Sequence, residues 1–360
     1  MKFEVNNMDG IEFFSFASKP VSKELEIKAS KMFSRLSSQA RKNTKRDKCY
    51  YCERNCTSFC NSHSIPMFAL ERIAQNGKVT SFLENAISPS KDNRGVKNTG
   101  TFQMICNECD SKIFHDYENP NGYNDMPSNA MLSQIALKNY LHLIWKRTSE
   151  NEFYRLSKKE GLPYADEKIF WGEMDLGFYS KEYAYAKKSL EKDSEGYYIC
   201  FFRHLDYIIP YAAQAAITLI GDLEDNLIND IYSTDVSYKT SEIHIMALPL
   251  KETSVVLAFI KNGDKRYRKF YKQLRSLPIE EQLSTINYIL FNNTENIFVN
   301  PVVAKSLFEN EAFQSICRQS SDYITDIFGC NINPIKQAIE KFSLSQRKLI
   351  PNLLSEEFAL

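Results

Sequence analysis

Two Cys-x-x-Cys pairs constrain the fold of this chain more than any other feature of its sequence. The first pair is Cys49 and Cys52, and the second is Cys106 and Cys109. Each pair can place two thiolates on one tight turn, where they bind one side of a tetrahedral Zn²⁺. Because two such pairs complete a four-cysteine site, the sequence predicts one structural zinc ion held by these residues.

The other cysteines leave alternatives open. Six of the nine cysteines lie between residues 49 and 109. A secreted disulfide-rich domain would be shorter and would carry a signal sequence, whereas this N-terminus is acidic and has no apolar segment. Clustered cysteines in an intracellular protein indicate a metal site. The alternatives are buried thiols without a metal, or a local site built from Cys49, Cys52, Cys56, Cys60 and His63.

The composition is that of an ordinary globular protein. Hydrophobic residues make up 43% of the 360 residues and charged residues 25%, which excludes a collagen-like or wholly disordered chain. At about 100–200 residues per domain, this length suggests two or three domains. No apolar run is long enough for a transmembrane helix, so we expect a cytoplasmic protein that does not bind membranes.

The net charge hides a local excess of basic residues. The chain has 45 basic and 45 acidic residues, which argues against a uniformly basic surface for nucleic acid. Five basic residues nevertheless fall directly before the first cysteine pair: Arg41, Lys42, Lys45, Arg46 and Lys48. They can bind the phosphates of a nucleic acid, or they can form the solvated end of a helix.

Hydrophobic spacing and turn residues predict the elements of the N-terminal third. Residues 1–17 are interpreted as a strand or an arm. Residues 21–41 have helical spacing and one basic face. A short helix over residues 65–76 is expected to end with Gly77 as its C-cap. A loop, a short strand and a short helix are expected over residues 84–100, 101–105 and 110–118.

From residue 127 the pattern changes to long helices followed by strands. Helices are expected over residues 128–147 and from the break at Pro163 to residue 192. Four segments rich in Val, Ile, Phe and Tyr are expected to form strands of one sheet. These segments are residues 197–209, 215–220, 242–248 and 254–260. The remainder, from Asp264, is expected to be mostly helical.

The expected fold class is α+β, with an N-terminal zinc-stabilised module followed by a mixed helix and sheet domain. We place the boundary between residues 120 and 128. Residues 1–48 would form an arm and a basic helix, and residues 49–125 the zinc module. Residues 126–360 would form an α+β domain that regulates, targets or oligomerises the protein.

The residues around the cysteine pairs form a family pattern. A His-Ser-Ile-Pro segment begins at His63, and Asp110 directly follows the second pair. Together with the pairs, residues 73–78 and Glu118, this arrangement resembles the HNH endonuclease superfamily, the ββα-metal fold, in its zinc-ribbon form. It is most similar to a divergent bacterial branch that is often linked to anti-phage or restriction loci. The resemblance covers about residues 45–120.

The resemblance implies a site for phosphodiester hydrolysis. His63 would be the general base, since neutral imidazole is available at pH 7. Asp110 would bind a catalytic Mg²⁺ or Mn²⁺. Two positions depart from the family pattern: Ser62 stands where the first metal ligand is usual, and the middle Asn has no secure counterpart.

Helix geometry selects a further candidate ligand or orienting group. If Asp110 opens a helix, Glu118 lies within about 80° of its direction, whereas His115 lies about 140° away. Glu118 is therefore the third candidate catalytic residue. Each candidate also has a structural explanation. His63 can be a satisfied structural histidine, Asp110 a favourable carboxylate at a helix start, and Glu118 a solvated surface carboxylate.

One further segment combines basic and aromatic residues. Residues 261–275 (KNGDKRYRKFYKQLR) interleave cations with Tyr and Phe, as a nucleic-acid surface does. The same pattern suits an amphipathic helix whose aromatic side chains point inward, which is the interpretation we prefer.

These observations predict a metal-dependent nuclease in bacterial defence, with DNA rather than RNA as its expected partner. The alternative is a non-catalytic HNH-like zinc module that binds nucleic acid or a protein partner within a defence complex. Ser62 and the missing Asn favour the alternative, whereas His63 and Asp110 favour the nuclease.

Overall fold

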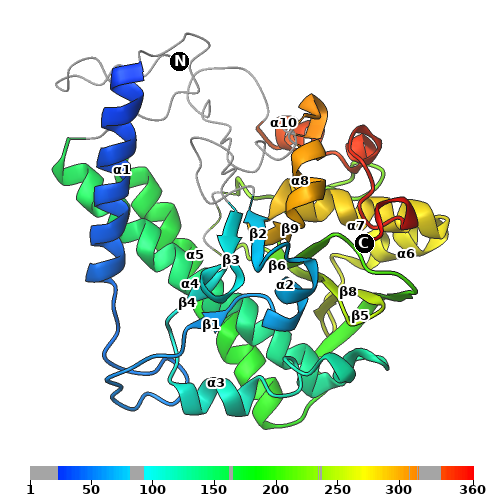
Figure 1. The fold of residues 1–360 in the computed structure, drawn as a ribbon, viewed down its shortest axis with the longest axis horizontal. Helices are drawn as coiled ribbons and strands as arrows, with labels where there is room; N and C mark the ends of the chain where they lie inside the picture. Colours follow the sequence, from blue (N-terminus) through cyan, green and yellow to red (C-terminus); the bar gives the residue numbers. More distant parts are fainter. Residues whose placement is uncertain are drawn as a thin grey trace. The chain divides into compact units, whose positions relative to one another are not determined.

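The chain divides into two compact units, and Figure 1 shows its helices and strands coloured along the sequence. The computed structural model describes residues 23–81, 93–161, 165–233, 235, 237–307, 309–313, 315 and 334–360. The expected strand or arm at residues 1–17, and residues 84–92 of the expected loop, lie outside the described residues. The first unit comprises Met1–Ser62, Phe102–Lys112 and Tyr140–Tyr185, and the second comprises His63–Thr101, Ile113–Asn139 and Ala186–Leu360. These units interleave along the chain, and the domain boundary at residues 120–128 stays a prediction.

Long helices build most of the first unit. Leu36 and Ala40, in the helix over residues 23–43, are buried together with Phe153, in the helix over residues 129–159. Met32 and Phe33 pack against them. This apolar stripe at helical spacing explains why the predicted helices form. The helices are α1 (Lys23–Asn43), the part of α4 (Asn129–Lys159) that follows residue 139, and the part of α5 (Ala165–Glu191) that precedes residue 186.

Helix α4 continues beyond residue 147, where the sequence pattern predicts its end. Its charged second half bonds to α1. Arg35 pairs with Glu160 at 3.0 Å, and the Asn43 amide donates to Glu152 at 2.7 Å. These two contacts show that α1 and α4 run antiparallel, and they explain why a polar segment stays helical.

A seven-stranded sheet forms the centre of the second unit, and all its neighbouring strands are antiparallel. All four segments predicted as strands overlap strands of this one sheet, but the first ends at Leu205 and not at residue 209, and the second covers Tyr211–Ile217 and not residues 215–220. The pattern does not predict the other three, because such short strands show no clear alternation. In sheet order the strands are β3 (Asn93–Gly95), β2 (Lys78–Ser81), β9 (Ile297–Val299), β6 (Tyr211–Ile217), β7 (Ile243–Pro249), β8 (Ser254–Lys261) and β5 (Tyr197–Leu205).

Two helices bury the core of this unit against the sheet. Phe270 of α6 (Arg268–Ser276) and Ile286 of α7 (Ile279–Asn293) lie in one cluster with Ile245 of β7.

Within the described ranges, no helix has the length and apolar character needed to cross a membrane. The other helices are α2 (Met67–Ile73), α3 (Asn107–Ile113), α8 (Pro301–Leu307), α10 (Pro334–Lys341) and the 3₁₀ helices Val96–Asn98, Pro120–Tyr123, Leu344–Leu349 and Glu356–Phe358. The short strands β1 (Ser62–His63) and β4 (Thr101–Phe102) pair with each other.

The expected helix over residues 65–76 ends early, at Ile73. Asn76 and Gly77 have φ values of 53° and 70°, and a bridge joins Gln75 to Lys78. Two successive positive φ values are typical of the type I′ turn of a two-residue hairpin. The prediction of Gly77 as a helix C-cap is therefore wrong, because the Asn-Gly pair turns a hairpin instead.

The expected helix over residues 110–118 lies instead at Asn107–Ile113. The backbone N–H of Tyr117 donates to the Gln134 side chain at 2.8 Å, so it does not extend the helical ladder. Glu118 therefore lies outside the helix that contains Asp110. The prediction that the two residues share a helix face is wrong. The role of Glu118 stays a prediction.

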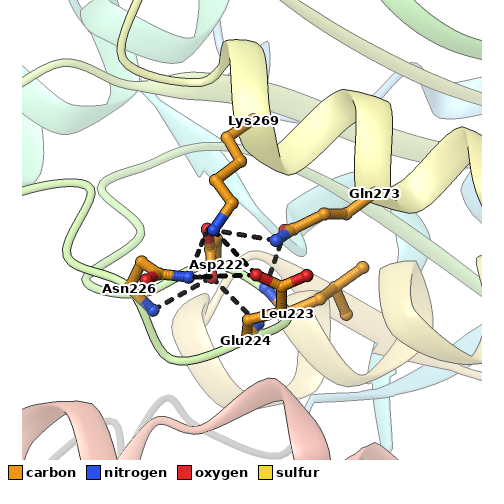
Figure 2. A network of polar contacts seen from close by, with 6 residues as sticks. All are labelled: Asp222, Leu223, Glu224, Asn226, Lys269 and Gln273. Atoms are coloured by element: carbon orange, nitrogen blue, oxygen red, sulfur yellow. Dashed lines mark hydrogen bonds and ion pairs between the residues drawn. The ribbon is translucent and has the colours of Figure 1, made fainter.

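The loop after β6 is closed around a buried carboxylate (Figure 2). Asp222 accepts hydrogen bonds from the backbone N–H groups of Glu224 and Asn226, at 2.9 and 3.0 Å, and from the Gln273 amide at 3.2 Å. Lys269 lies 3.6 Å away. Burial by itself would raise the pKa of Asp222, but the hydrogen bonds led by Asn226 outweigh it and hold the pKa below its usual range.

We expect Asp222→Asn to lower the free energy of unfolding by about 1–3 kcal/mol at neutral pH, because buried donors lose their acceptor. A carboxylate whose folded pKa is depressed stabilises the fold above its unfolded pKa, and loses this effect as pH falls through the folded value. The difference between wild type and variant should therefore shrink below about pH 4. Urea unfolding at several pH values measures it, with the exposed partner Glu224→Gln as the control of small effect.

Candidate metal centre and predicted catalytic residues

The four predicted zinc ligands converge in the first unit. The sulfur atoms of Cys49, Cys52, Cys106 and Cys109 all lie within 4.8 Å of one another. Tetrahedral Zn–S bonds of about 2.3 Å place sulfurs about 3.8 Å apart, so the cluster has the size of a zinc site. Two of the residues are buried and two are half-buried. These cysteines can hold a metal ion.

Local backbone contacts bring the two pairs together. The N–H of Cys49 donates to the Arg54 carbonyl at 3.0 Å, and the N–H of Glu53 donates to the Cys49 carbonyl at 2.9 Å. The N–H of Cys106 donates to the Cys49 sulfur at 3.4 Å. Cys109 lies in the first turn of α3. The first pair therefore occupies a closed turn, and the second occupies a helix start.

A basic side chain prepares one ligand for a metal. The Nε of Arg54 donates to the Cys52 sulfur at 3.4 Å, and its Nη2 pairs with Glu108 at 2.6 Å. The hydrogen bonds from Arg54 lower the pKa of the Cys52 thiol to about 6, whereas burial raises the pKa of Cys109. The thiolate is the form of cysteine that binds metal, so the Arg54 contact favours this form of Cys52, whereas burial disfavours it for Cys109.

The alternative local site is not brought together. Among the described residues, the one group of His, Cys, Asp or Glu side chains that can hold a metal is the four-cysteine cluster, without Cys56 and Cys60. The Cys60 thiol instead donates to Asp110 at 3.2 Å.

We expect purified protein to contain about one zinc ion per chain, measured by elemental analysis. Cys106→Ser should lose the metal and unfold at lower temperature, because binding at such a site is also folding energy. Cys56→Ser is the matched control, since it removes a nearby thiol outside the cluster, and it should keep the metal. Loss of zinc from Cys56→Ser, with zinc kept in Cys106→Ser, would instead support the local site.

The predicted metal ligand Asp110 lies beside Ser62 in the first unit. Asp110 is 8% exposed, and its Oδ1 accepts a hydrogen bond of 2.5 Å from the Ser62 hydroxyl. The Cys60 thiol bonds to Oδ2. Sequence reasoning treats Ser62 as a departure from the family pattern and does not predict this contact.

The predicted base His63 belongs to the second unit. Its Nε2 lies 3.1 Å from the Val96 carbonyl oxygen. Because a carbonyl only accepts, Nε2 carries the proton in this contact, and Nδ1 of the neutral ring is then the acceptor. The next residue, Ser64, is fixed by a 2.8 Å bond to the Gly100 carbonyl and a 2.6 Å bond to Asn296. These contacts hold the chain at His63 in one position.

Gly100 is required at this place. Its φ is 62°, and a Cβ there would lie 2.8 Å from the Phe298 ring and 3.0 Å from the Ser64 hydroxyl. Any larger residue would strain the backbone and push Ser64 away.

Glu118, also in the second unit, pairs with a buried lysine. Its carboxylate lies 3.1 Å from the ammonium of Lys138, whose side chain is fully buried. That ammonium also lies 3.7 Å from the centre of the Phe114 ring. Glu118 is therefore the counter-charge of a buried cation. Lys138 could have been found in the sequence, because it lies three residues after Ile135 and seven after Met131, on the apolar stripe of a helix.

The five predicted nucleic-acid-binding residues are all exposed in the first unit, where Arg41 and Lys42 form the last turn of α1: Arg41, Lys42, Lys45, Arg46 and Lys48. The Arg46 guanidinium lies 4.9 Å above the ring of Tyr50. That ring packs edge-on against Tyr183 of α5, with the centroids 4.9 Å apart. The basic segment is thus attached to the first cysteine turn, as the sequence predicts.

The predicted catalytic residues fall in different units. Asp110 and the four cysteines belong to the first, whereas His63 and Glu118 belong to the second. Comparisons of the chain with family models, with curated proteins and with solved structures give no match.

Proposed function

We propose that this protein is a metal-dependent nuclease with an HNH-like site beside its four-cysteine cluster. The observation that carries the proposal is the contact between Ser62 and Asp110, 2.5 Å apart. In the family pattern, these two positions would share the catalytic ion, and here their oxygen atoms converge. Strands β1 and β4 also pair, and α3 follows β4, with α2, β2 and β3 between the two paired strands in the chain.

The donor atoms suit the expected ion. A hydroxyl and a carboxylate oxygen are hard ligands, and Mg²⁺ usually binds one or two carboxylates and keeps several waters. When bound, the ion would stabilise charge on the phosphate and the leaving oxygen. The role of general base would fall to His63, as the resemblance implies, and Nδ1 is the acceptor of its neutral ring. The exposed cations before Cys49 would bind the phosphate backbone, with DNA as the proposed substrate.

The same contact also supports a second candidate, a non-catalytic module that binds nucleic acid or a protein. Asp110 is buried, and both of its oxygens already accept hydrogen bonds, from Ser62 and Cys60. A carboxylate satisfied by the protein needs no ion. This candidate predicts binding without cleavage.

The first test compares cleavage of plasmid DNA with added Mg²⁺ or Mn²⁺ by wild type and by His63→Ala. Loss of a general base should lower the rate by about 10²–10⁴-fold and leave zinc content unchanged. His204→Ala is the control, since His204 is an exposed histidine of the same unit, and it should cut normally. Equal rates for all three proteins would refute the assigned base.

Asp110→Asn keeps the shape of the side chain and removes its charge. We expect it to lose cleavage and to need more Mg²⁺ or Mn²⁺ for any residual rate. A wild type that binds DNA but never cuts it, with either ion, would establish the second candidate.

Replacing Arg41, Lys42, Lys45 and Arg46 with Gln should weaken binding to all duplex sequences alike. The slope of log affinity against log salt should fall by up to about 0.9 for each phosphate that the variant no longer neutralises. A salt titration of binding by fluorescence anisotropy measures both quantities. A solvated helix end predicts unchanged affinity and an unchanged slope.

A further inference from the structure

The exposed face of α6 carries cations that the fold itself does not use. This helix buries Phe270 and Leu274, so the amphipathic interpretation of residues 261–275 is confirmed. All its basic side chains point outward, and two more precede it: the exposed set is Lys265, Arg266, Arg268, Lys269, Lys272 and Arg275. The whole chain is neutral, so this excess is local.

Three of these cations have structural partners. Lys269 pairs with Glu224 at 2.7 Å. The Arg266 guanidinium donates to Asn229 at 3.0 Å. Arg275 donates to the backbone carbonyls of Cys200 and Ile199.

The other three cations are available to a ligand. Within the part of the chain that the structure describes, Lys265, Arg268 and Lys272 make no ion pair and no side-chain hydrogen bond. Arg268 lies in the first turn of α6, which has no acidic residue. A cation there opposes the helix dipole and lowers helix stability, so these charges do not serve the fold.

The helix arranges these charges as a stripe. At about 100° per residue, Arg268, Lys272 and Arg275 lie within about 60° of one another around the axis, over a length of about 10 Å. Phe270 and Leu274 project from the opposite side. A row of cations on one side of a helix matches a row of phosphates.

Two aromatic rings lie at the end of this stripe, with Tyr198 exposed and Tyr271 half-buried. Arg275 donates to the carbonyls of Cys200 and Ile199 at 2.9 and 3.1 Å, and its guanidinium lies 5.2 Å from the Tyr271 ring centre and 5.7 Å from that of Tyr198. Tyr198 is 40% exposed. An exposed ring beside a basic stripe is a platform on which an unpaired base can stack.

We propose that Lys265, Arg268, Lys272 and Tyr198 form a surface that binds single-stranded nucleic acid. The cations bind its phosphates and the tyrosine stacks with a base. A membrane surface is disfavoured, because among the described residues this surface has a single exposed large hydrophobic side chain, Tyr198. A duplex is disfavoured, because its bases are already stacked. This surface binds without cleavage and lies in the second unit, so it does not depend on the proposed nuclease site.

The test measures binding of a labelled oligothymidine of about 16 nucleotides, and of the matching oligouridine, without added Mg²⁺ or Mn²⁺. The triple variant Lys265→Gln, Arg268→Gln, Lys272→Gln should bind at least about tenfold more weakly at low salt. Its salt slope should fall by up to about 2, at about 0.7 per neutralised phosphate on a single strand. The control triple variant Lys239→Gln, Lys251→Gln, Lys305→Gln removes the same charge from exposed positions outside α6, and should bind as wild type does.

Tyr198→Ala tests the stacking contact separately. It should weaken binding about tenfold with an unchanged salt slope, and Tyr198→Phe, which keeps the ring, should restore affinity. Wild type that binds neither oligonucleotide, or equal losses in both triple variants, would overturn the proposal. So would a triple variant that loses only binding to vesicles containing phosphatidylserine. The thermal midpoint of the triple variant should not fall, because no structural contact is removed.

Discussion

The convergence of four sulfur atoms is the constraint on which the first unit depends. Four thiols within 4.8 Å cannot all ionise without a cation, because like charges at this distance repel strongly. Two of them show the conflict, since Arg54 lowers the pKa of Cys52 while burial raises that of Cys109. A bound divalent cation would reduce this repulsion, because it cancels half of the charge of four thiolates. Zinc binding at such sites contributes about 10–16 kcal/mol, as much as the whole stability of a typical domain.

This site also fixes the surroundings of the residues proposed to act on nucleic acid. Cys49 and Cys109 are buried, and their neighbours in sequence are Lys48 and Asp110. A metal bound by the cysteines would therefore hold the end of the basic segment and the start of α3 in one small rigid region. The second unit contains a buried cation instead. There, the ammonium of Lys138 is fully buried and lies 3.1 Å from the half-exposed carboxylate of Glu118, so removing Glu118 would take a counter-charge from a buried cation.

The sequence predicts those features that depend on local spacing. The four predicted metal ligands follow from two Cys-x-x-Cys pairs, and the strands β5 to β8 overlap the four segments rich in Val, Ile, Phe and Tyr. Features that depend on contacts between residues far apart in the sequence could not be predicted from local patterns. Strand β2 pairs with β9 across more than half the chain, and α3 ends at Ile113, after which the Tyr117 N–H donates to Gln134. No periodicity contains either fact, so the argument for Glu118 failed where tertiary contacts override a local pattern.

Both candidate functions depend on whether Asp110 binds an ion or keeps its hydrogen bond to Ser62. A hydroxyl is a neutral ligand, so the pair brings a single negative charge to an ion, whereas two carboxylates would bring two. Fewer charges lower affinity for the ion, and the hydrogen bond itself competes with ion binding. A site of this kind stays folded without its ion, because Ser62 and Cys60 satisfy the buried carboxylate. It would then acquire activity only when the concentration of the divalent ion is high enough to displace a hydrogen bond that the fold already provides.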